Sequence, residues 1–325
     1  MRPGTPQQRG AALIMAMLTV ALVTSLAGLA LWQQWRSVAV ETAQKTRLQS
    51  LWVLTGAQDW ARLILREDGR SGGPDHLGEP WAVPLAEARL STFLAADKTV
   101  QDDDPLLPQA FLSGSITDLQ GRLNVQNLVV DGQVSEPDLL AFAKLFALLK
   151  LPPEELQVLV YKLRLARNTT ASPNDQGTQS LQPLQPQRIE QLGWLGVSAA
   201  SLARLQPFIT LLPVATPVNL NTASAEVIYA CIPSLTLAQA QRLVNQRQLL
   251  HFQTLADVSK VVAETNGQLS DARHGVKTRF FEIRGRLRQD QLVVEQRAVV
   301  QRDDLVVKVL WRQDGAPTPL PPTLQ

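Results

Sequence analysis

An uncharged run of 22 residues, from Ala11 to Trp32, constrains this chain of 325 residues more than any other feature. As an α-helix the run is roughly 33 Å long, which is enough to cross a bilayer core of about 30 Å. Trp35 follows Trp32 at the end of the run, where interfacial aromatic residues are typical. Basic residues precede the run, so the positive-inside rule predicts a cytoplasmic amino terminus and places everything after Arg36 beyond the membrane.

Three interpretations of this amino terminus compete. A secretory signal cleaved near residues 27–30 needs an apolar core of only about 7–15 residues, and this run is longer. The second interpretation is a plain membrane anchor. The third is a leader of the prepilin type over residues 1–10, which is short, basic and polar and ends in Gly10. The segment Gln8–Met15 resembles this third case, in which cleavage on the cytoplasmic side makes Ala11 the N-methylated terminus.

The helical pattern continues beyond the apolar run. Between Trp32 and Leu65 there is no proline and only one glycine, Gly56. Apolar residues recur there at spacings of three or four, which predicts one face of an amphipathic helix: Leu48, Leu51, Leu54, Ala57, Ala61 and Ile64. We therefore expect one helix over residues 11–67, with residues 11–32 in the membrane and the rest packed on a soluble domain.

Charge and cysteine content exclude several function classes. The net charge is +2, and Arg2 and Arg9 account for it, because 29 basic and 29 acidic residues remain without them. A general polyanion binder needs a clustered basic surface, so this balance argues against one. The single cysteine, Cys231, lies in an apolar helical run and is interpreted as a small buried residue rather than a nucleophile.

No local motif for catalysis or metal binding is present in the sequence. The histidines His76, His251 and His274 are widely spread, and H-E-x-x-H, C-x-x-C, G-x-S-x-G and phosphate-loop motifs are absent. The acidic run Asp102–Asp104 lacks the EF-hand spacing and predicts a solvated turn. We therefore predict no enzyme activity and no catalytic, cofactor-binding or metal site.

The soluble part alternates between strand and helix patterns. Residues 111–125 predict two strands around a turn, in which Gly121 supplies a positive φ and Asp118 bonds the turn backbone. Residues 135–270 show helical periodicity. Three alternating runs predict an antiparallel meander at residues 277–287, 292–301 and 304–312. The layout is therefore helix, strands, helical insertion and strands, which is an α+β arrangement.

Several stretches resemble the K family of minor pseudopilins of bacterial type II secretion. Besides Gln8–Met15 they are the acidic and Trp-Ala motif of residues 79–82, the string Gly114–Leu128 and the segment Thr216–Arg247. The resemblance implies a pilin-like fold with a long N-terminal transmembrane helix, an antiparallel sheet and an inserted all-helical domain, with Trp81 anchoring a loop. It divides the chain into a leader (1–10), the N-terminal helix (11–67), an α/β pilin-like domain (68–128 and 275–313), an inserted helical domain (129–274) and a disordered tail (314–325).

The fifth residue after the predicted cleavage site, Met15, carries a specific implication. Most pilin-like subunits have Glu at this position, and in the family that Glu pairs with the amino terminus of a neighbouring subunit. Its absence marks the K type. A carboxylate in hydrocarbon is costly unless it is paired, and a subunit at the tip of a filament has no subunit above it to supply the partner.

The resemblance also implies a function, partners and a location. The protein would initiate the type II secretion pseudopilus at its tip and aid export of folded proteins from the periplasm. Its partners would be the I and J minor pseudopilins, the major pseudopilin, the prepilin peptidase and possible secreted cargo, but no nucleic acid. It would be a single-pass protein of the inner membrane with a periplasmic domain. Family members bind calcium through an acid-rich loop, but the matching residues 161–182 contain only one carboxylate, Asp175, so we predict no bound calcium.

Two other functions remain open. One is a minor pilin of a type IV pilus. The other is a membrane-tethered DNA-binding protein, because Asn219–Arg247 resembles a helix-hairpin-helix module. Such a module has a Gly-x-Gly turn that meets phosphate, whereas this chain has Ile232–Leu235, without glycine.

Overall fold

The computed structural model describes residues 9–91, 110–167, 183–289, 292–315 and 318–319. It divides into two compact units, Met1–Val53 and Leu54–Gln325, which are treated separately below. The helix α1 (Arg9–Ser71) belongs to both. The predicted continuous helix is confirmed, and it is slightly longer at each end than the expected span of 11–67.

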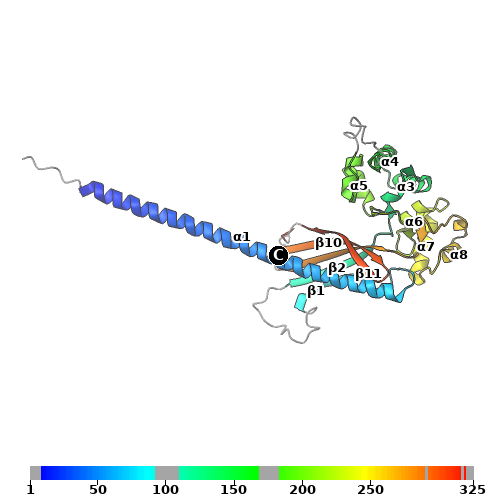
Figure 1. The fold of residues 1–325 in the computed structure, drawn as a ribbon, viewed down its shortest axis with the longest axis horizontal. Helices are drawn as coiled ribbons and strands as arrows, with labels where there is room; N and C mark the ends of the chain where they lie inside the picture. The colour runs from blue at the N-terminus through cyan, green and yellow to red at the C-terminus, as the bar shows by residue number, and fades with distance from the viewer. Residues whose placement is uncertain (1–8, 92–109, 168–182, 290–291, 316–317, 320–325) are drawn as a thin grey trace, which may run out of the picture. The chain divides into compact units, whose positions relative to one another are not determined.

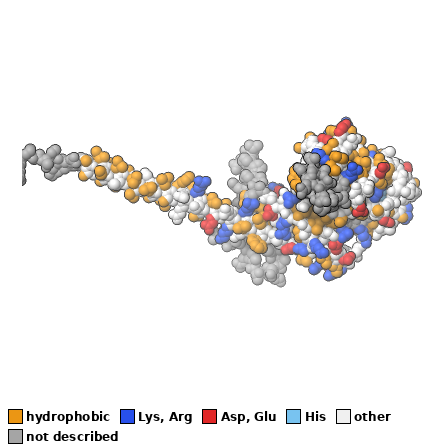
Figure 2. All heavy atoms as spheres, turned by 45° about the horizontal axis from the view of Figure 1, so that its top comes forward, with side chains coloured by type: hydrophobic (Ala, Val, Ile, Leu, Met, Phe, Trp, Pro, Cys, Tyr) orange, Lys and Arg blue, Asp and Glu red, His pale blue; other side chains and the backbone are white. Residues whose placement is uncertain are grey.

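The first unit is the apolar part of α1. Figure 2 shows hydrophobic side chains along this segment, and Leu13, Leu22 and Leu31 are all exposed. By length and composition α1 is able to cross a membrane. Such exposed apolar side chains are stable in lipid, so they fit a membrane anchor.

A six-stranded sheet and the end of α1 form the first part of the second unit (Figure 1). The strands pair antiparallel in the order β1 (Leu85–Arg89), β2 (Ala110–Asp118), β9 (Phe280–Gln289), β10 (Leu292–Asp303) and β11 (Val306–Asp314). β12 (Thr318–Pro319) also pairs with β10. The three predicted C-terminal strands are therefore present, and their ends differ from the predicted ones by at most three residues.

The two faces of the sheet differ because side chains alternate along each strand. Phe281 and Ile283 of β9 pack with Val300 and Val307 in a core that also includes Ala61 and Leu65 of α1. The intervening Glu282 and Arg284 lie on the opposite face. The buried residues of α1 in this unit are Leu54, Gln58, Ala61 and Leu65, so the sequence pattern identified Leu54 and Ala61 but missed Gln58 and Leu65.

The described α-helices that follow β2 gather beyond one end of the sheet (Figure 1). Between β2 and β9 the chain forms α3 (Glu136–Leu148), α4 (Pro153–Arg167), α5 (Ala199–Leu205), α6 (Ala225–Cys231), α7 (Leu237–Leu249) and α8 (Leu255–Val261). The described residues also form the 3-10 helices η1 (Pro80–Ala82), η2 (Val125–Leu128), η4 (Ile189–Leu195) and η5 (Ala263–Thr265). The apolar faces of the helices after β2 form one large core that includes Phe142, Leu159 and Ile228.

Short strand pairs connect the helices. β3 (Leu123–Asn124) pairs in parallel with β6 (Ile209–Thr210), β4 (Val129–Val130) with β5 (Gln133–Val134), and β7 (Val218–Asn219) in parallel with β8 (His274–Gly275). Residues 111–125 therefore form two strands around a turn, as predicted, but these strands, β2 and β3, do not pair with each other as a hairpin. β2 pairs with β9, whereas Leu123 and Val125 belong to the core of the helical part, so the boundary expected at residue 128 falls inside that part.

The role predicted for Gly121 is also wrong. Gly121 is not among the residues of positive φ. A Cβ at this position would lie 2.8 Å from the Oγ1 of Thr222, which is closer than real contacts allow. Gly121 is therefore required by close packing of the turn on the segment before α6, and not by a left-handed backbone.

Some predictions fall on residues that the structure does not describe. The acidic run Asp102–Asp104 and the greater part of the segment matched to the family's calcium loop, residues 168–182, lie outside the described residues. Within the predicted tail, Thr318–Pro319 form β12, and the structure describes nothing beyond Pro319.

Candidate functional site: the buried polar junction

The predicted processing residues lie at the start of α1. Gly10 and Ala11 are in its first turn, and Met15 follows about one turn later with 72% of its surface exposed. An exposed, neutral side chain at this position is compatible with hydrocarbon. Cleavage after Gly10, methylation of Ala11 and the assembly role of Met15 remain predictions.

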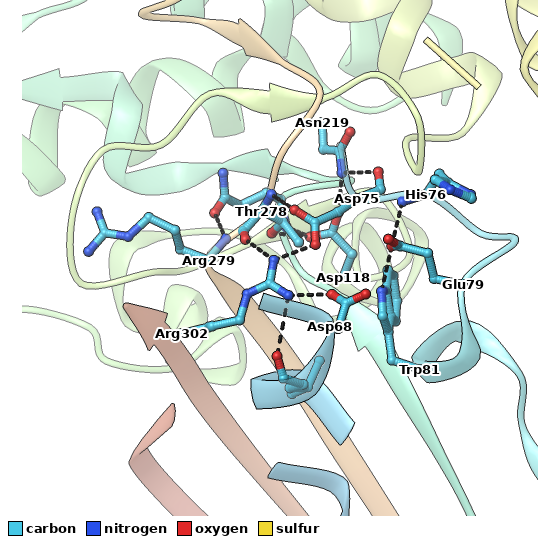
Figure 3. A network of polar contacts seen from close by, with 12 residues as sticks. Asp68, Asp75, His76, Glu79, Trp81, Asp118, Asn219, Thr278, Arg279 and Arg302 are labelled. Carbon is cyan, nitrogen blue, oxygen red and sulfur yellow. Dashed lines mark hydrogen bonds and ion pairs between the residues drawn. The ribbon is translucent and has the colours of Figure 1, made fainter. Parts of the chain in front are cut away.

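A dense polar network lies where the sheet meets the helical part (Figure 3). At its centre is the carboxylate of Asp118, the last residue of β2. Its Oδ1 accepts hydrogen bonds from the backbone N–H of Gln120 (2.6 Å) and the Thr278 hydroxyl (2.6 Å). Its Oδ2 accepts from the Asn219 amide (2.9 Å) and the Thr222 hydroxyl (2.6 Å). Burial raises the pKa of Asp118, although the four hydrogen bonds oppose that effect.

Asn219 connects three segments of the chain at this network. Besides bonding Asp118, its Nδ2 donates to the backbone oxygen of Asp75 (3.1 Å), and its Oδ1 accepts from the N–H of Asn221 (3.0 Å). Gln120 adds a second link, because its Oε1 accepts from the N–H of Arg279 (2.7 Å). The loop after α1, the end of β2 and the short strand β7 are therefore held together by one hydrogen-bonded network.

An ion-paired arginine forms the charged side of the junction. Arg302 of β10 contacts the carboxylates of both Asp68, near the end of α1, and Asp75. It also donates to the backbone oxygen of Thr278 (3.1 Å). Burial opposes the charge of Arg302, but the two carboxylates hold the pKa of its guanidinium above its ordinary value. This triad fixes the end of α1 to the sheet.

Asp68, Asp75 and Glu79 are the one group of at least three potential metal ligands within the part of the chain that the structure describes. Their ligand atoms lie within 4.8 Å of one another. Arg302 already supplies the positive charge between Asp68 and Asp75, so the cluster is an ion-pair network rather than a cage of free oxygen ligands. Sequence reasoning missed the ion pairs with Arg302 because this residue lies 234 and 227 residues from the two aspartates.

Glu79 fixes the loop that carries Trp81. Its Oε2 accepts hydrogen bonds from the N–H of His76 (2.9 Å) and from Trp81 Nε1 (2.7 Å). The buried indole of Trp81 meets Phe281 edge to face at 5.2 Å, which agrees with its predicted anchoring role. Burial raises the pKa of Glu79 to about 7, and the nearby carboxylates of Asp68 and Asp75 act in the same direction.

The structure shows the surroundings of the single cysteine and of the segment that resembles a helix-hairpin-helix module. Cys231 is buried, and burial raises the pKa of its thiol to about 12, which agrees with the interpretation as a small buried residue.

In the segment that resembles a DNA-binding module, Asn221 exchanges hydrogen bonds with the backbone of Phe252 (2.9 Å each way). Arg247 donates to the backbone oxygen of Leu220 (2.6 Å), and burial lowers its pKa to about 10. The side chains of Asn221 and Arg247 therefore bond to the protein's own backbone and are not presented to a phosphate backbone.

The structure brings together two histidines that are far apart in sequence. The rings of His76 and His251 stack with centroids 3.7 Å apart. His274 is elsewhere and buried, with Nε2 3.2 Å from the backbone oxygen of Cys231. The stacked pair joins the loop after α1 to the segment before α8, so it reinforces the junction.

Comparison with known proteins places the chain in a family. Two sequence models of type II secretion system protein K match, one over residues 121–214 and one over residues 218–277. Type II secretion system protein K of Pseudomonas aeruginosa is 29% identical over 299 residues, which cover 85% of this chain and 83% of the relative. The protein of the same description from Pectobacterium carotovorum is 23% identical over 342 residues, with coverages of 95% and 97%.

A solved structure has the same fold. A chain in the crystal structure of the GspK-GspI-GspJ complex from enterotoxigenic Escherichia coli superposes with a TM-score of 0.62. It is 17% identical, and the match covers 84% of this chain and 98% of that one.

The apolar N-terminal helix, the antiparallel sheet and the helical insertion define a single-pass, membrane-anchored protein of the pilin-like class. Within that class, the chain belongs to the type II secretion system protein K family and is a minor pseudopilin of type II secretion.

Proposed function

We propose that this minor pseudopilin occupies the tip of the type II secretion pseudopilus and initiates its assembly. The observation that carries this position is the neutral Met15, at the place where a subunit inside the filament needs a paired carboxylate. The buried junction supports an assembly role rather than catalysis, because each oxygen of Asp118 is used in holding two parts of the chain together.

Its partners in this proposal are the I and J minor pseudopilins. The similar solved chain was crystallised in a complex with GspI and GspJ, and its fold is the fold of this chain. The amino terminus lies in the cytoplasm and residues after Arg36 lie in the periplasm, because basic residues precede the apolar run. The type IV pilus alternative loses support from the family match.

End-labelling of filaments tests the tip position. Pseudopili are sheared from cells that overproduce the major pseudopilin and carry an epitope in the exposed turn between β10 and β11, next to Leu305. Gold-labelled antibody should mark one end of each filament and nothing along its length. Labelling distributed along the filaments would refute the tip position.

A separate experiment tests the partners. Co-purification of tagged protein from detergent-solubilised membranes should recover the I and J proteins in equal amounts.

Processing of the leader is a separate part of the proposal. Mass spectrometry of the native protein should show a mature chain that starts at Ala11 and carries one extra methyl group. Gly10→Val should leave the leader attached. A mature start near Leu31 would instead identify a conventional signal peptide.

We also propose that the protein works without calcium. Isothermal calorimetry on the purified chain should show no binding at micromolar calcium, because residues 161–182 contain a single carboxylate and calcium takes about 6–8 oxygen ligands. Saturable micromolar binding would disprove this part alone.

A further inference from the structure

A cavity of about 270 Å³ lies between the polar face of the sheet and the helical part, on the side of the sheet opposite α1. Arg284 and Glu282 of β9 and Arg297 of β10 form its floor, and Arg122 and Arg188 reach it from the connecting segments. A second hollow of about 550 Å³ shares four of its residues and continues it along the sheet: Glu190, Gln206, Arg284 and Arg297.

The floor of this cavity places two like charges together. Arg284 and Arg297 are direct cross-strand partners of β9 and β10. Like charges in such positions destabilise a sheet. Both guanidinium groups turn to one carboxylate, Glu282, whose side chain is only 6% exposed: its oxygens lie 2.6 Å from Arg284 Nε and 3.5 Å from Arg297 Nε. One buried carboxylate therefore serves two arginines.

Arg122 adds a further positive charge to the same cavity. Among the described residues its guanidinium forms no ion pair and no hydrogen bond. Burial lowers the pKa of Arg122, and Arg284 and Arg297 act in the same direction, although Glu282 opposes them. A guanidinium in this position gains from an added anion, because it has lost part of its water without gaining a protein partner.

The rim of the cavity contains an aromatic ring that two arginines contact and one half-exposed carboxylate. The guanidinium groups of Arg188 and Arg297 lie 5.3 and 5.1 Å from the centre of the Trp311 ring. Glu190 lies 3.3 Å from Arg297, and its side chain is 52% exposed. Four arginines and two glutamates line the cavity, so its formal charge is +2.

We propose that this cavity binds the carboxylate of an aspartate or glutamate side chain in an acidic polypeptide segment, with Arg122 and Arg284 as its donors. The planar guanidinium fork fits a carboxylate with two parallel hydrogen bonds. The adjoining hollow is lined by Ser113, Ser115 and Gln313, whose side chains can bond the backbone of the segment on either side of the acid. This inference is independent of the filament position.

Calorimetry with short peptides tests the proposal on the full chain in neutral detergent. The probe is acetyl-triglutamate amide, and the matched control is acetyl-triglutamine amide. The glutamate peptide should bind saturably at one site, more weakly as NaCl increases, and the glutamine peptide should not bind. Arg122→Gln should weaken binding at least tenfold. Arg242→Gln, at an exposed arginine on α7, should change it less than twofold.

A second substitution, which should change the peptide affinity in the opposite direction, controls for the possibility that Arg122→Gln loses binding only through misfolding. Glu190→Gln removes a competing acid at the exposed rim and should tighten binding of the glutamate peptide several-fold. Absence of binding, equal binding of both peptides, or unchanged affinity in Arg122→Gln and Glu190→Gln would each overturn the proposal. Tighter binding of inorganic phosphate than of the glutamate peptide would make the cavity a phosphate site and would also overturn it.

Discussion

At the scale of single residues, Asp118 shows how one side chain joins two parts of the chain. A carboxylate has lone pairs for all four donors around it, whereas an amide in its place turns an NH₂ group toward two of them. We expect Asp118→Asn to lower the free energy of unfolding by about 2–4 kcal/mol. Thr222→Val, which removes one of the donors, should cost only about 1 kcal/mol. Urea denaturation in neutral detergent measures both, and equal stability of Asp118→Asn and wild type would contradict this account.

Glu79 makes a prediction about pH. Its pKa is raised to about 7 from 4.5, so the folded protein holds a proton that the unfolded chain has released in that interval. The contribution of this group to stability is complete below about pH 4.5 and is lost as the pH rises toward 7. Glu79→Gln keeps the neutral form, so it should match wild type near pH 4.5 and exceed it by about 1 kcal/mol near pH 8, a value discounted for the half-exposed carboxylate.

The difference in unfolding free energy between wild type and Glu79→Gln, measured across pH, reports on Glu79 alone, because all other groups titrate in both proteins. A constant stability difference from about pH 4.5 to about pH 8 would show that Glu79 has an ordinary pKa. Gln at this position still accepts the hydrogen bonds from His76 N–H and Trp81 Nε1, so the loop should remain in place.

The residues of the junction could be found in the sequence only in part. Asp118 and Trp81 stood out as a turn residue and an apolar anchor. The side-chain partners of Asp118 did not, because Asn219, Thr222 and Thr278 lie 101, 104 and 160 residues from it. A single sequence carries no signal for contacts at such separations, so neither Arg302 with its two aspartates nor the arginine cavity was predicted.

At the scale of elements, the buried face of α1 carries a polar residue in an apolar row. Gln58 is 1% exposed, and within the described residues neither its Nε2 nor its Oε1 has a hydrogen-bond partner. Since an unsatisfied buried amide is destabilising, Gln58→Leu should raise the free energy of unfolding by about 1–2 kcal/mol. Gln58→Glu, which adds a charge at the same place, should lower it by more than about 2 kcal/mol. A less stable leucine variant in urea denaturation would show that the amide is satisfied.

Substitution of two glycines of the second unit by alanine should change the free energy of unfolding in opposite directions. Gly121→Ala forces a Cβ to within 2.8 Å of Thr222, so it should destabilise the protein by about 1–3 kcal/mol. Gly56 lies in α1 with nothing within 4 Å of an added Cβ, so Gly56→Ala should stabilise by about 0.5–1 kcal/mol through helix propensity. Paired urea curves measure both, and a neutral Gly121→Ala would remove close packing as its explanation.

The elements themselves were largely predictable, since hydrophobic periodicity is a local signal. This periodicity is found in α1, in the helices α3 and α4 around Phe142 and Leu159, and in the three strands of the meander, β9, β10 and β11. Pairing was less predictable. The two strands expected over residues 111–125 are present as β2 and β3, but they do not pair with each other. Asp118 at the end of β2 bonds within the junction, and β3 pairs with the distant β6, Leu123 opposite Ile209.

At the scale of the whole molecule, the uncharged anchor and the soluble unit must serve one assembly. The proposed assembly residue of the anchor is Met15, and we expect Met15→Glu to impair secretion. A carboxylate in hydrocarbon costs about 3 kcal/mol unless it is paired, and a tip subunit has no neighbour to provide the partner. Met15→Leu should secrete like wild type. Secretion of a cargo protein into the medium measures both variants, with membrane levels of each compared by immunoblot.

The same substitution separates the tip position from a position inside the filament. A subunit inside the filament would pair the introduced carboxylate with the amino terminus of its neighbour, so secretion would be retained or improved. At the tip the charge stays unpaired, so secretion should fall several-fold while the amount of protein in the membrane drops only modestly. Because the soluble unit is untouched by this change, normal recovery of the I and J proteins with Met15→Glu would locate the defect in the bilayer, where the carboxylate lacks a partner.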